Sequence, residues 1–365
     1  MRDRYEEDFM KKFEYMEKHG YEQLVFFYDK TTGLKGITCI HDTTLGPALG
    51  GTRLWNYENE DDATLDVLRL ARGMTYKAAA AGLNLGGGKT VLIGDASKVK
   101  NEAYFRGLGR YVQSLNGRYI TAEDINTSTK DMDYVNMETD YVVGLEGKSG
   151  NPSPMTALGA FHGIQASLQE VFGDSTIEGR TFSVQGAGQT GYYLIGYLLE
   201  AKAKKVYFTE INDKHIEKVK REFPEVEFVE PDDVYKLDVD VFAPCALGAV
   251  MNDKTIPQLK CKIVAGTSNN VLEDEEKHGN MLKKAKILYA PDFVINAGGL
   301  INVYHELQGY NQEKAKRDIS RIYDRLMDVY RLARENDTHT QHAAKLFAKE
   351  RIKTISDLRS NYIRR

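Results

Sequence analysis

Two lysines and one aspartate stand where they could share chemistry. Lys89 ends the run Gly86-Gly-Gly-Lys89, Lys77 lies near the end of a segment with helical periodicity, and Asp124 follows a predicted strand. A partly buried lysine beside another cation has a lowered pKa and can exchange a proton near neutrality. Taken singly, the lysines would be surface residues and Asp124 a helix cap. Taken together with a nicotinamide site, they predict hydride transfer at the α-carbon of an anionic substrate.

A glycine fingerprint for a dinucleotide lies further along the chain. It follows a predicted strand at 181–185, precedes a predicted helix at 192–201, and reads Gly186-Ala187-Gly188-Gln189-Thr190-Gly191. The glycines permit a tight turn, approach of the pyrophosphate and close helix packing, and the helix N-terminus attracts phosphate. Glu210, nineteen positions after Gly191, would bind the ribose hydroxyls and repel a 2′-phosphate. The fingerprint therefore predicts NAD rather than NADP.

The run that ends at Lys89 superficially resembles a P-loop. That motif requires a glycine where this chain has Leu83, and a helix where this chain has the predicted strand Thr90-Val-Leu-Ile. A nucleoside triphosphatase is therefore rejected on spacing and on context.

Composition excludes several classes of protein. A chain of 365 residues with a net charge of −4 and a pI of about 6.1 is long enough for two domains and has no global attraction to nucleic acid. We expect no membrane segment, since no stretch approaches about 20 apolar residues, and no signal peptide. The cysteines are few and widely spaced, which favours reduced thiols in a cytoplasmic protein and no metal site: Cys39, Cys245 and Cys261.

The pattern of elements predicts an α/β protein of two domains with a cleft between them. We expect a substrate and oligomerisation domain at 1–142, to which a C-terminal helix at 336–365 returns. Short apolar runs alternate with helices at 143–335, which predicts a Rossmann domain with a doubly wound parallel sheet. The Gly-, Ser- and Pro-rich segment 144–154 is interpreted as the hinge.

At these residues the chain resembles the superfamily of glutamate, leucine, phenylalanine and valine dehydrogenases, and its leucine dehydrogenases most closely. The matching stretches extend over nearly the whole chain and include His41–Arg53, Arg72–Lys77, Gly82–Lys89, Thr121–Asp124, Gly150–Pro154, Ala243–Gly248 and Val294–Gly299.

The resemblance implies reversible oxidative deamination of an L-amino acid to a 2-oxo acid and ammonia, with NAD. It implies that Lys77 binds the α-carboxylate, that Lys89 activates water, and that Asp124 moves protons at the amino group. It also places Asn270 near the substrate, Asn269 near the nicotinamide, and two further residues in the lining of the substrate site, Met74 and Gly50. A homo-oligomer, commonly an octamer, is implied as well.

The substrate side chain is predicted from the apolar positions. Glutamate dehydrogenases of the superfamily have a lysine at the position of Leu49 and a hydroxyl residue at that of Val303, so a γ-carboxylate would be left unpaired here. The residues expected to enclose a hydrocarbon side chain are Leu49, Ala122, Leu300 and Val303.

Leucine is therefore favoured as the substrate. Leu300 replaces a usual valine and also resembles a tryptophan dehydrogenase, so phenylalanine and tryptophan remain alternatives. A non-catalytic amino acid or NAD sensor is a further one. Asn126 replaces a usual glycine and is expected in a left-handed conformation, and Gln189-Thr190 replaces a usual Asn-Val in the cofactor turn.

Overall fold

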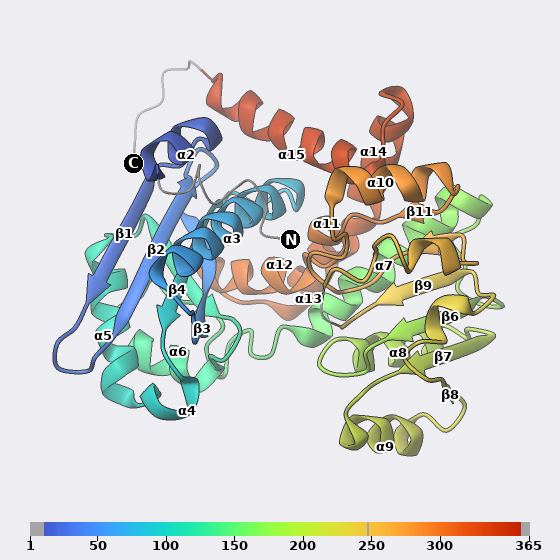
Figure 1. The fold of residues 1–365 in the computed structure, drawn as a ribbon, viewed down its shortest axis with the longest axis horizontal. Helices are drawn as coiled ribbons and strands as arrows, with labels where there is room; N and C mark the ends of the chain where they lie inside the picture. Colours follow the sequence, from blue (N-terminus) through green and yellow to red (C-terminus); the bar gives the residue numbers. More distant parts are fainter. Residues whose placement is uncertain (1–10, 247, 359–365) are drawn as a thin grey trace. The chain divides into compact units, whose positions relative to one another are not determined.

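The computed structural model describes residues 11–246 and 248–358, which divide into two compact units. The first unit contains the described residues up to Asn151, Glu306–Tyr310, and the described residues from Lys349 onward. The second consists of Pro152–His305 and Asn311–Ala348. Figure 1 shows the elements of both units in the order of the chain.

The first unit is built on a mixed sheet of five strands. Its strands are β1 (Gln23–Tyr28), β2 (Lys35–Asp42), β3 (Ala48–Trp55), β4 (Gly86–Ile93) and β5 (Tyr119–Glu123). Their order is β1-β2-β4-β3-β5, and β3 lies parallel to both β4 and β5 while the pairs β1/β2 and β2/β4 are antiparallel. The carboxyl ends of β3 and β5 therefore meet at one edge of the sheet.

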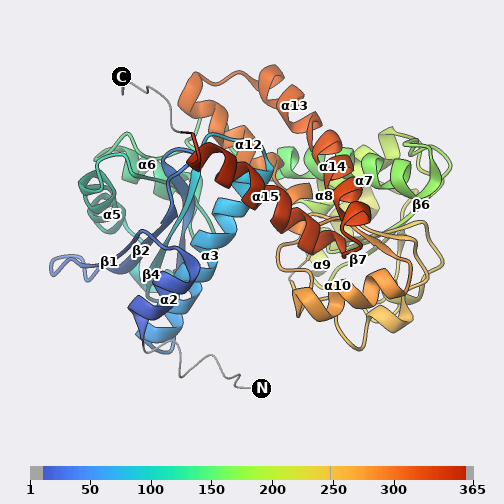
Figure 2. The same ribbon diagram turned by 90° about the horizontal axis from the view of Figure 1, so that it is seen from above.

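Helices cover both faces of this sheet. Figure 2 shows α3 on one face and α5 and α6 on the other. The helices of the unit are α2 (Lys12–His19), α3 (Glu60–Ala80), α4 (Ala96–Val99), α5 (Glu102–Ser114) and α6 (Thr129–Asn136), and the C-terminal turns of α15 (Thr340–Ser356) also belong to it.

Helix α3 begins directly after Asn59 and packs directly on β4. The side chain of Asn59 caps it by accepting a hydrogen bond from the backbone N–H of Asp62. A Cβ atom on Gly87 would lie 2.1 Å from the backbone nitrogen of Thr75 and 2.6 Å from the carbonyl oxygen of Ala71. The glycine run before Lys89 therefore lets the helix backbone touch the strand.

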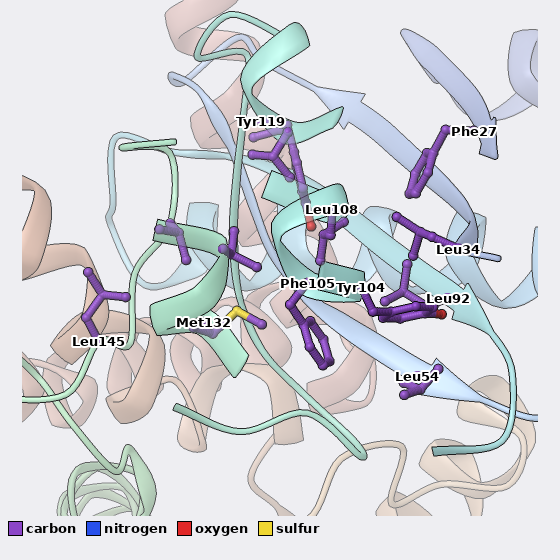
Figure 3. Packing of buried hydrophobic residues seen from close by; sticks show 14 of the residues in the cluster. Phe27, Leu34, Leu54, Leu92, Tyr104, Phe105, Leu108, Tyr119, Met132 and Leu145 are labelled. Carbon is purple, nitrogen blue, oxygen red and sulfur yellow. The ribbon is translucent and has the colours of Figure 1, made fainter. Parts of the chain in front are cut away.

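The opposite face of the sheet carries the larger apolar core of this unit, shown in Figure 3. Aromatic and aliphatic side chains from β1, β4, α5, β5 and α6 fill it, including Phe27, Leu92, Phe105, Tyr119 and Met132. These side chains are almost completely removed from water, which supplies the main driving force for the fold of the unit.

The second unit contains a six-stranded sheet in which every pair is parallel, as predicted. Its order is β11-β10-β9-β6-β7-β8, with β6 (Thr181–Gln185), β7 (Lys205–Thr209), β8 (Glu227–Phe228), β9 (Val241–Pro244), β10 (Ile263–Val264) and β11 (Leu288–Tyr289). The strand order reverses between β6 and β9, and such a switch point is where doubly wound sheets bind ligands.

The helices of the second unit connect and flank these strands. They are α7 (Ser153–Phe172), α8 (Gly191–Glu200), α9 (Asp213–Glu222), α10 (Glu275–Lys284), α11 (Asp292–Ile295), α12 (Gly298–Tyr304), α13 (Gln312–Ser320) and α14 (Ile322–Glu335), with short 3-10 turns at Val234–Lys236 and Ile256–Gln258. A third 3-10 turn, His305–Gln308, begins in the second unit and continues into the first. In the described part of the chain, none of the helices combines the length and the hydropathy needed to cross a membrane.

Gly87→Ala tests whether the close packing of α3 on β4 requires glycine. The added methyl group would collide with backbone atoms, which cannot move aside as a flexible side chain can, so we expect a loss of about 1–3 kcal/mol of stability. The matched control is Gly73→Ala on the same helix, where no atom lies within 4 Å and alanine should be neutral or stabilising. Thermal unfolding measures both, and equal transition midpoints for the two variants would contradict the packing argument.

Candidate functional site

The sheet of the first unit brings Lys89 and Asp124 to one face. Thr52 on β3 lies opposite Thr90 on β4 and opposite Glu123 on β5. Because successive side chains alternate between faces, the neighbours of these three residues point to the other side, which is the side of α3. Those neighbours are Arg53, Lys89 and Asp124.

These three side chains form an ion network in which Lys89 is buried and Arg53 and Asp124 are half-buried. The ammonium of Lys89 lies 3.1 Å from Oδ2 of Asp124, and Nε of Arg53 donates to the same oxygen at 2.9 Å. Nη1 of Arg53 also donates to Oδ2 of Asp66 on α3 at 3.0 Å, and the hydroxyl of Tyr57 donates to that carboxylate at 2.5 Å. Lys89 and Asp124, which are predicted to share chemistry, are thus in direct contact.

Burial and charge together set the protonation of the network. Burial acts to raise the pKa of Asp124, but the charges of Lys89 and Arg53 outweigh it and hold this pKa at about 2. Burial lowers the pKa of Lys89, and the carboxylate of Asp124 opposes that shift. Lys89 is only 4% exposed, so its interpretation as a surface lysine is wrong. The pair combines an ionised acid with a lysine that is easier to deprotonate than usual.

The oxygens of Asp124 are not equivalent. Both cations contact Oδ2, and within the described residues no group donates a hydrogen bond to Oδ1. The backbone N–H of Asp124 donates to the hydroxyl of Thr127 at 2.8 Å, so the residue is fixed at its main chain as well. Oδ1 is therefore the oxygen that remains available to exchange a proton with a bound molecule.

Glycine makes room for this carboxylate. A Cβ atom on Gly51 would lie 2.4 Å from the carbonyl oxygen of Glu123 and 3.0 Å from Cβ of Asp124. Asn126, two residues further on, has a φ of 61°, which confirms the expected left-handed conformation, and its side chain donates to the carbonyl of Leu54 at 3.0 Å.

The other residues predicted for the substrate site in this unit surround the same strands. Lys77 is half-buried in the last turn of α3, the helix that packs on the strand of Lys89, and Met74 is half-buried one turn earlier. Leu49 and Ala122 are buried on β3 and β5, and the alternation of the strands puts both on the α3 face. The carbonyl of Gly50 accepts a hydrogen bond from the buried hydroxyl of Tyr119.

Three members of the network were not predicted as site residues: Arg53, Asp66 and Tyr57. Arg53 lies in a stretch that carries the family resemblance, and strand alternation from Gly51 would have put it on the face of Asp124. Asp66 and Tyr57 had no comparable signal, because the contact of Asp66 with Arg53, on which the bond from Tyr57 to Asp66 builds, depends on how α3 crosses the sheet.

In the second unit, the dinucleotide fingerprint has the predicted geometry. It connects β6 to α8, and Gly186 has a φ of 89°, as a tight turn requires. A Cβ atom on Gly191 would lie 1.9 Å from the carbonyl oxygen of Gly186, so only glycine fits at the start of α8. Glu210 directly follows β7, and its Oε2 accepts a hydrogen bond from the backbone N–H of Ala187 at 2.9 Å. The remaining turn residues, Gly188, Gln189 and Thr190, directly precede α8, which begins at Gly191.

Backbone and side-chain contacts also hold the predicted asparagines. Asn270 has a φ of 51°, and its carbonyl accepts from the backbone N–H of Ala249 at 2.6 Å. The side-chain oxygen of Asn269 accepts from the amide group of the buried Asn296 at 2.7 Å. Asn296 belongs to the stretch Val294–Gly299 that carries the family resemblance, and it is the residue that orients Asn269.

Leu300 and Val303, the remaining predicted lining residues, lie one turn apart on α12 in the second unit. Both are buried at 7% exposure. They present aliphatic surface on one side of that helix.

A group of possible metal ligands lies near the start of α15. The carboxylate of Glu276 is 3.2 Å from Nε2 of His339 and 3.9 Å from Nδ1 of His342. The backbone N–H of His342 donates to Nδ1 of His339, so Nε2 of His339 carries the proton and donates to Glu276. In this arrangement the group forms a hydrogen-bonded start of α15.

Comparison with known proteins agrees with this geometry. Residues 22–141 match the Glu/Leu/Phe/Val dehydrogenase dimerisation domain, and residues 208–360 match the Glutamate/Leucine/Phenylalanine/Valine dehydrogenase domain. The leucine dehydrogenase of Thermoactinomyces intermedius is 54% identical over 97% of both chains. The phenylalanine dehydrogenase of Lysinibacillus sphaericus is 44% identical over 89% of this chain and 87% of that one.

A solved structure is similar over the whole length. The crystal structure of L-tryptophan dehydrogenase from Nostoc punctiforme has a TM-score of 0.84 and 45% identity, and the match covers 94% of this chain and 99% of that one. The two-domain fold with a Rossmann-like second domain is thus confirmed.

Asp124→Asn tests the charge state of the network. Because the folded pKa of about 2 lies below the ordinary value of 3.8, the ionised form stabilises the protein above pH 4, and this contribution is lost as the pH falls towards 2. The difference in unfolding free energy between wild type and Asp124→Asn should therefore narrow by about 1 kcal/mol between pH 6 and pH 3.

The matched control is Glu138→Gln. Two arginines also contact that carboxylate, but the side chains of Arg106 and Arg110 are 40% and 72% exposed, so solvent screens their charges and the pH-dependent difference should be smaller. Chemical denaturation at each pH measures both variants. A constant difference for Asp124→Asn across this range would contradict the assigned ionisation.

Proposed function

Because the chain belongs to the glutamate, leucine, phenylalanine and valine dehydrogenase family and is an amino acid dehydrogenase, we propose that it catalyses the reversible, NAD-dependent oxidative deamination of a branched-chain L-amino acid, with leucine as the preferred substrate. The products are the 2-oxo acid and ammonia. The observation that carries the proposal is the buried contact of 3.1 Å between Lys89 and Asp124, which pairs a proton acceptor with a lysine of lowered pKa.

Each side chain has one task in this proposal. Lys77 holds the substrate α-carboxylate, and Oδ1 of Asp124 takes a proton from the amino group. Bound NAD would supply the acceptor for the hydride that leaves the α-carbon. Lys89 then takes a proton from the water that attacks this carbon, and Asp124 returns its proton to the amine nitrogen of the intermediate. As the C–N bond breaks, the hydroxyl group becomes the carbonyl and its proton leaves with ammonia as ammonium. Asn270 is assigned to the substrate and Asn269 to the nicotinamide.

The residues of the second unit fit a dinucleotide. At the turn, a Cβ atom on Gly188 would have no neighbour closer than 3.8 Å, which leaves room for a pyrophosphate before the N-terminus of α8. The hydroxyl of Thr190, in place of the usual valine, bonds to that of Thr267 at 2.5 Å, so the substituted turn remains anchored. These are the features that support Gly186, Ala187, Gly188, Gln189, Thr190 and Gly191 as the cofactor site.

Glu210 supports NAD rather than NADP. Its Oε1 accepts from the backbone N–H groups of Ile211 and Asn212, and its Oε2 from that of Ala187, so the carboxylate is held beside the fingerprint turn. A negative charge fixed at this place would accept hydrogen bonds from ribose hydroxyls and repel a 2′-phosphate.

Apolar side chains support leucine over glutamate. Leu49 and Ala122 on the sheet of the first unit offer only hydrocarbon, so a side-chain carboxylate placed against them would remain unpaired. Leu300 and Val303 on α12 of the second unit are likewise buried and aliphatic. An aromatic substrate is the second candidate, because the chain is also similar to tryptophan and phenylalanine dehydrogenases. Catalytic efficiencies for leucine, valine, phenylalanine and tryptophan decide between the two.

Assembly and location are further parts of the proposal. The chain carries the dimerisation domain of its family, and we assign it a homo-octamer. Buried or half-buried free thiols at Cys39, Cys245 and Cys261 are consistent with a reducing cytoplasm.

Lys89→Ala tests the catalytic assignment directly. NADH formation from leucine and NAD should be rapid for the wild type and reduced by about 10²–10⁴-fold in kcat for the variant, because the attacking water loses its base. NADH binding, measured by fluorescence, should survive. Lys98→Ala, which removes an exposed lysine of the same unit, is the control and should match the wild type. Undiminished turnover by Lys89→Ala would refute the role, and a wild type inactive with every amino acid would refute the function.

Lys77→Ala tests the binding of the substrate carboxylate. Loss of one charge-assisted contact, about 1.5–3 kcal/mol, should raise the Michaelis constant for leucine by roughly 10–150-fold while kcat changes less. Steady-state kinetics at saturating NAD measure this separation. An unchanged Michaelis constant would remove Lys77 from the substrate site.

A further inference from the structure

Arg53 is a charged residue of the buried network that the proposed reaction does not use. It lies on β3 between two carboxylates, with Asp124 on one side and Asp66 on the other. Its side chain is only 19% exposed, so its charge is largely removed from water. A charge in such a place is costly unless its partners compensate it, and here both partners are ionisable groups.

The charges of the network alternate in sign. Positive Lys89 contacts negative Asp124, positive Arg53 follows, and negative Asp66 comes next, at distances of 3.1, 2.9 and 3.0 Å. The hydroxyl of Tyr57 then closes the series on Oδ2 of Asp66. The series runs from the centre of the proposed chemistry to helix α3.

A guanidinium is suited to this position in a way that an ammonium is not. Arg53 uses Nε for Asp124 and Nη1 for Asp66, so one rigid group fixes two carboxylates at once. A lysine would offer a single point charge on a flexible chain. The geometry of Asp124 thus depends on a planar donor that α3 itself holds in place.

We propose that Arg53 is a positioning residue of the reaction: it holds Oδ2 of Asp124 against Lys89 and so leaves Oδ1 to exchange protons with the substrate amine. Asp66 on α3 accepts a hydrogen bond from the guanidinium, and the hydroxyl of Tyr57 in turn holds the carboxylate of Asp66. This inference rests on the proposed function, because it assigns Arg53 to the same proton transfers.

The arrangement has a consequence for protonation. Arg53 lowers the pKa of both Asp124 and Lys89, whereas Asp66 raises that of Lys89. Two further titratable groups interact electrostatically with Asp124 from the opposite face of the sheet: Glu123, bonded to Thr129, and the buried Tyr119.

These opposite influences predict opposite shifts. Deamination needs neutral Lys89, so its rate rises with pH as Lys89 loses its proton. Removing Arg53 should therefore move the rising limb of the pH profile to higher pH, and removing the charge of Asp66 should move it to lower pH.

The experiment compares pH profiles of kcat/KM for leucine deamination by the full-length enzyme. Arg53→Gln should shift the rising limb upward by about one unit, since a cation on the same carboxylate is lost, and should reduce kcat more than it raises KM. Arg53→Lys keeps the charge and should keep the wild-type profile while kcat falls. Asp66→Asn should shift the limb downward by less.

Arg106→Gln is the matched control. Arg106 also bridges two carboxylates of the first unit, Glu102 and Glu138, but it lies at the surface. Its removal should leave the profile superimposable on that of the wild type.

The outcomes separate the inference from the proposed function. An unshifted profile for Arg53→Gln, or a rise in KM alone, overturns the positioning role. If Arg53→Gln does not fold, a downward shift for Asp66→Asn supports the role and an unshifted profile overturns it. A wild type without amino acid dehydrogenase activity would instead refute the proposed function itself.

Discussion

In the first unit, the contacts of one carboxylate oxygen constrain how the strands must be aligned. Oδ2 of Asp124 accepts both the ammonium of Lys89 and the guanidinium of Arg53, in a region where burial alone would favour the protonated acid. Since the two cations outweigh that effect, the acid stays ionised and Lys89 is held beside it. The contact requires that β3, β4 and β5 keep their register, because a shift of one residue in any of these strands would turn its side chain to the other face.

The backbone meets this requirement through small residues on one face and hydroxyls on the other. Gly51 leaves space for Asp124, and Gly87 lets α3 lie directly on β4. On the opposite face, paired threonines satisfy one another: Thr38 bonds to Thr90 and Thr52 to Thr121, both at 2.7 Å. Such buried hydroxyl pairs would be costly if left unmade, so they reinforce the strand register that aligns Lys89 with Asp124.

Much of this could be predicted from the sequence, and the missing part has a physical cause. The cap at Asn59, the fingerprint between β6 and α8, and the parallel strands of the second unit follow from local patterns that a short segment carries by itself. The pairing of Lys89 with Asp124 also followed, since both adjoin predicted strands. The contacts of Asp66 and Tyr57 could not be predicted, because they depend on how α3 crosses the sheet, and no periodicity of the sequence encodes that crossing. The role of Asn296 could not be predicted for the same reason, because its contact with Asn269 joins segments that are distant in the chain.

In the second unit, too, hydrogen bonds hold the predicted site residues in place, but there the donors are neutral N–H groups. Glu210 is fixed by three backbone N–H groups before any ribose is present, and Asn269 is oriented by the amide of Asn296, which also donates to the carbonyls of Thr267 and Ser268. In both units, therefore, the residues assigned to the chemistry are held by partners that contact no ligand in the proposed reaction. Such preorganisation lowers the cost of ordering side chains when ligands bind. It also means that activity should be sensitive to residues that a search for reactive side chains alone would pass over, of which Arg53 is the one most directly connected to the proton transfers.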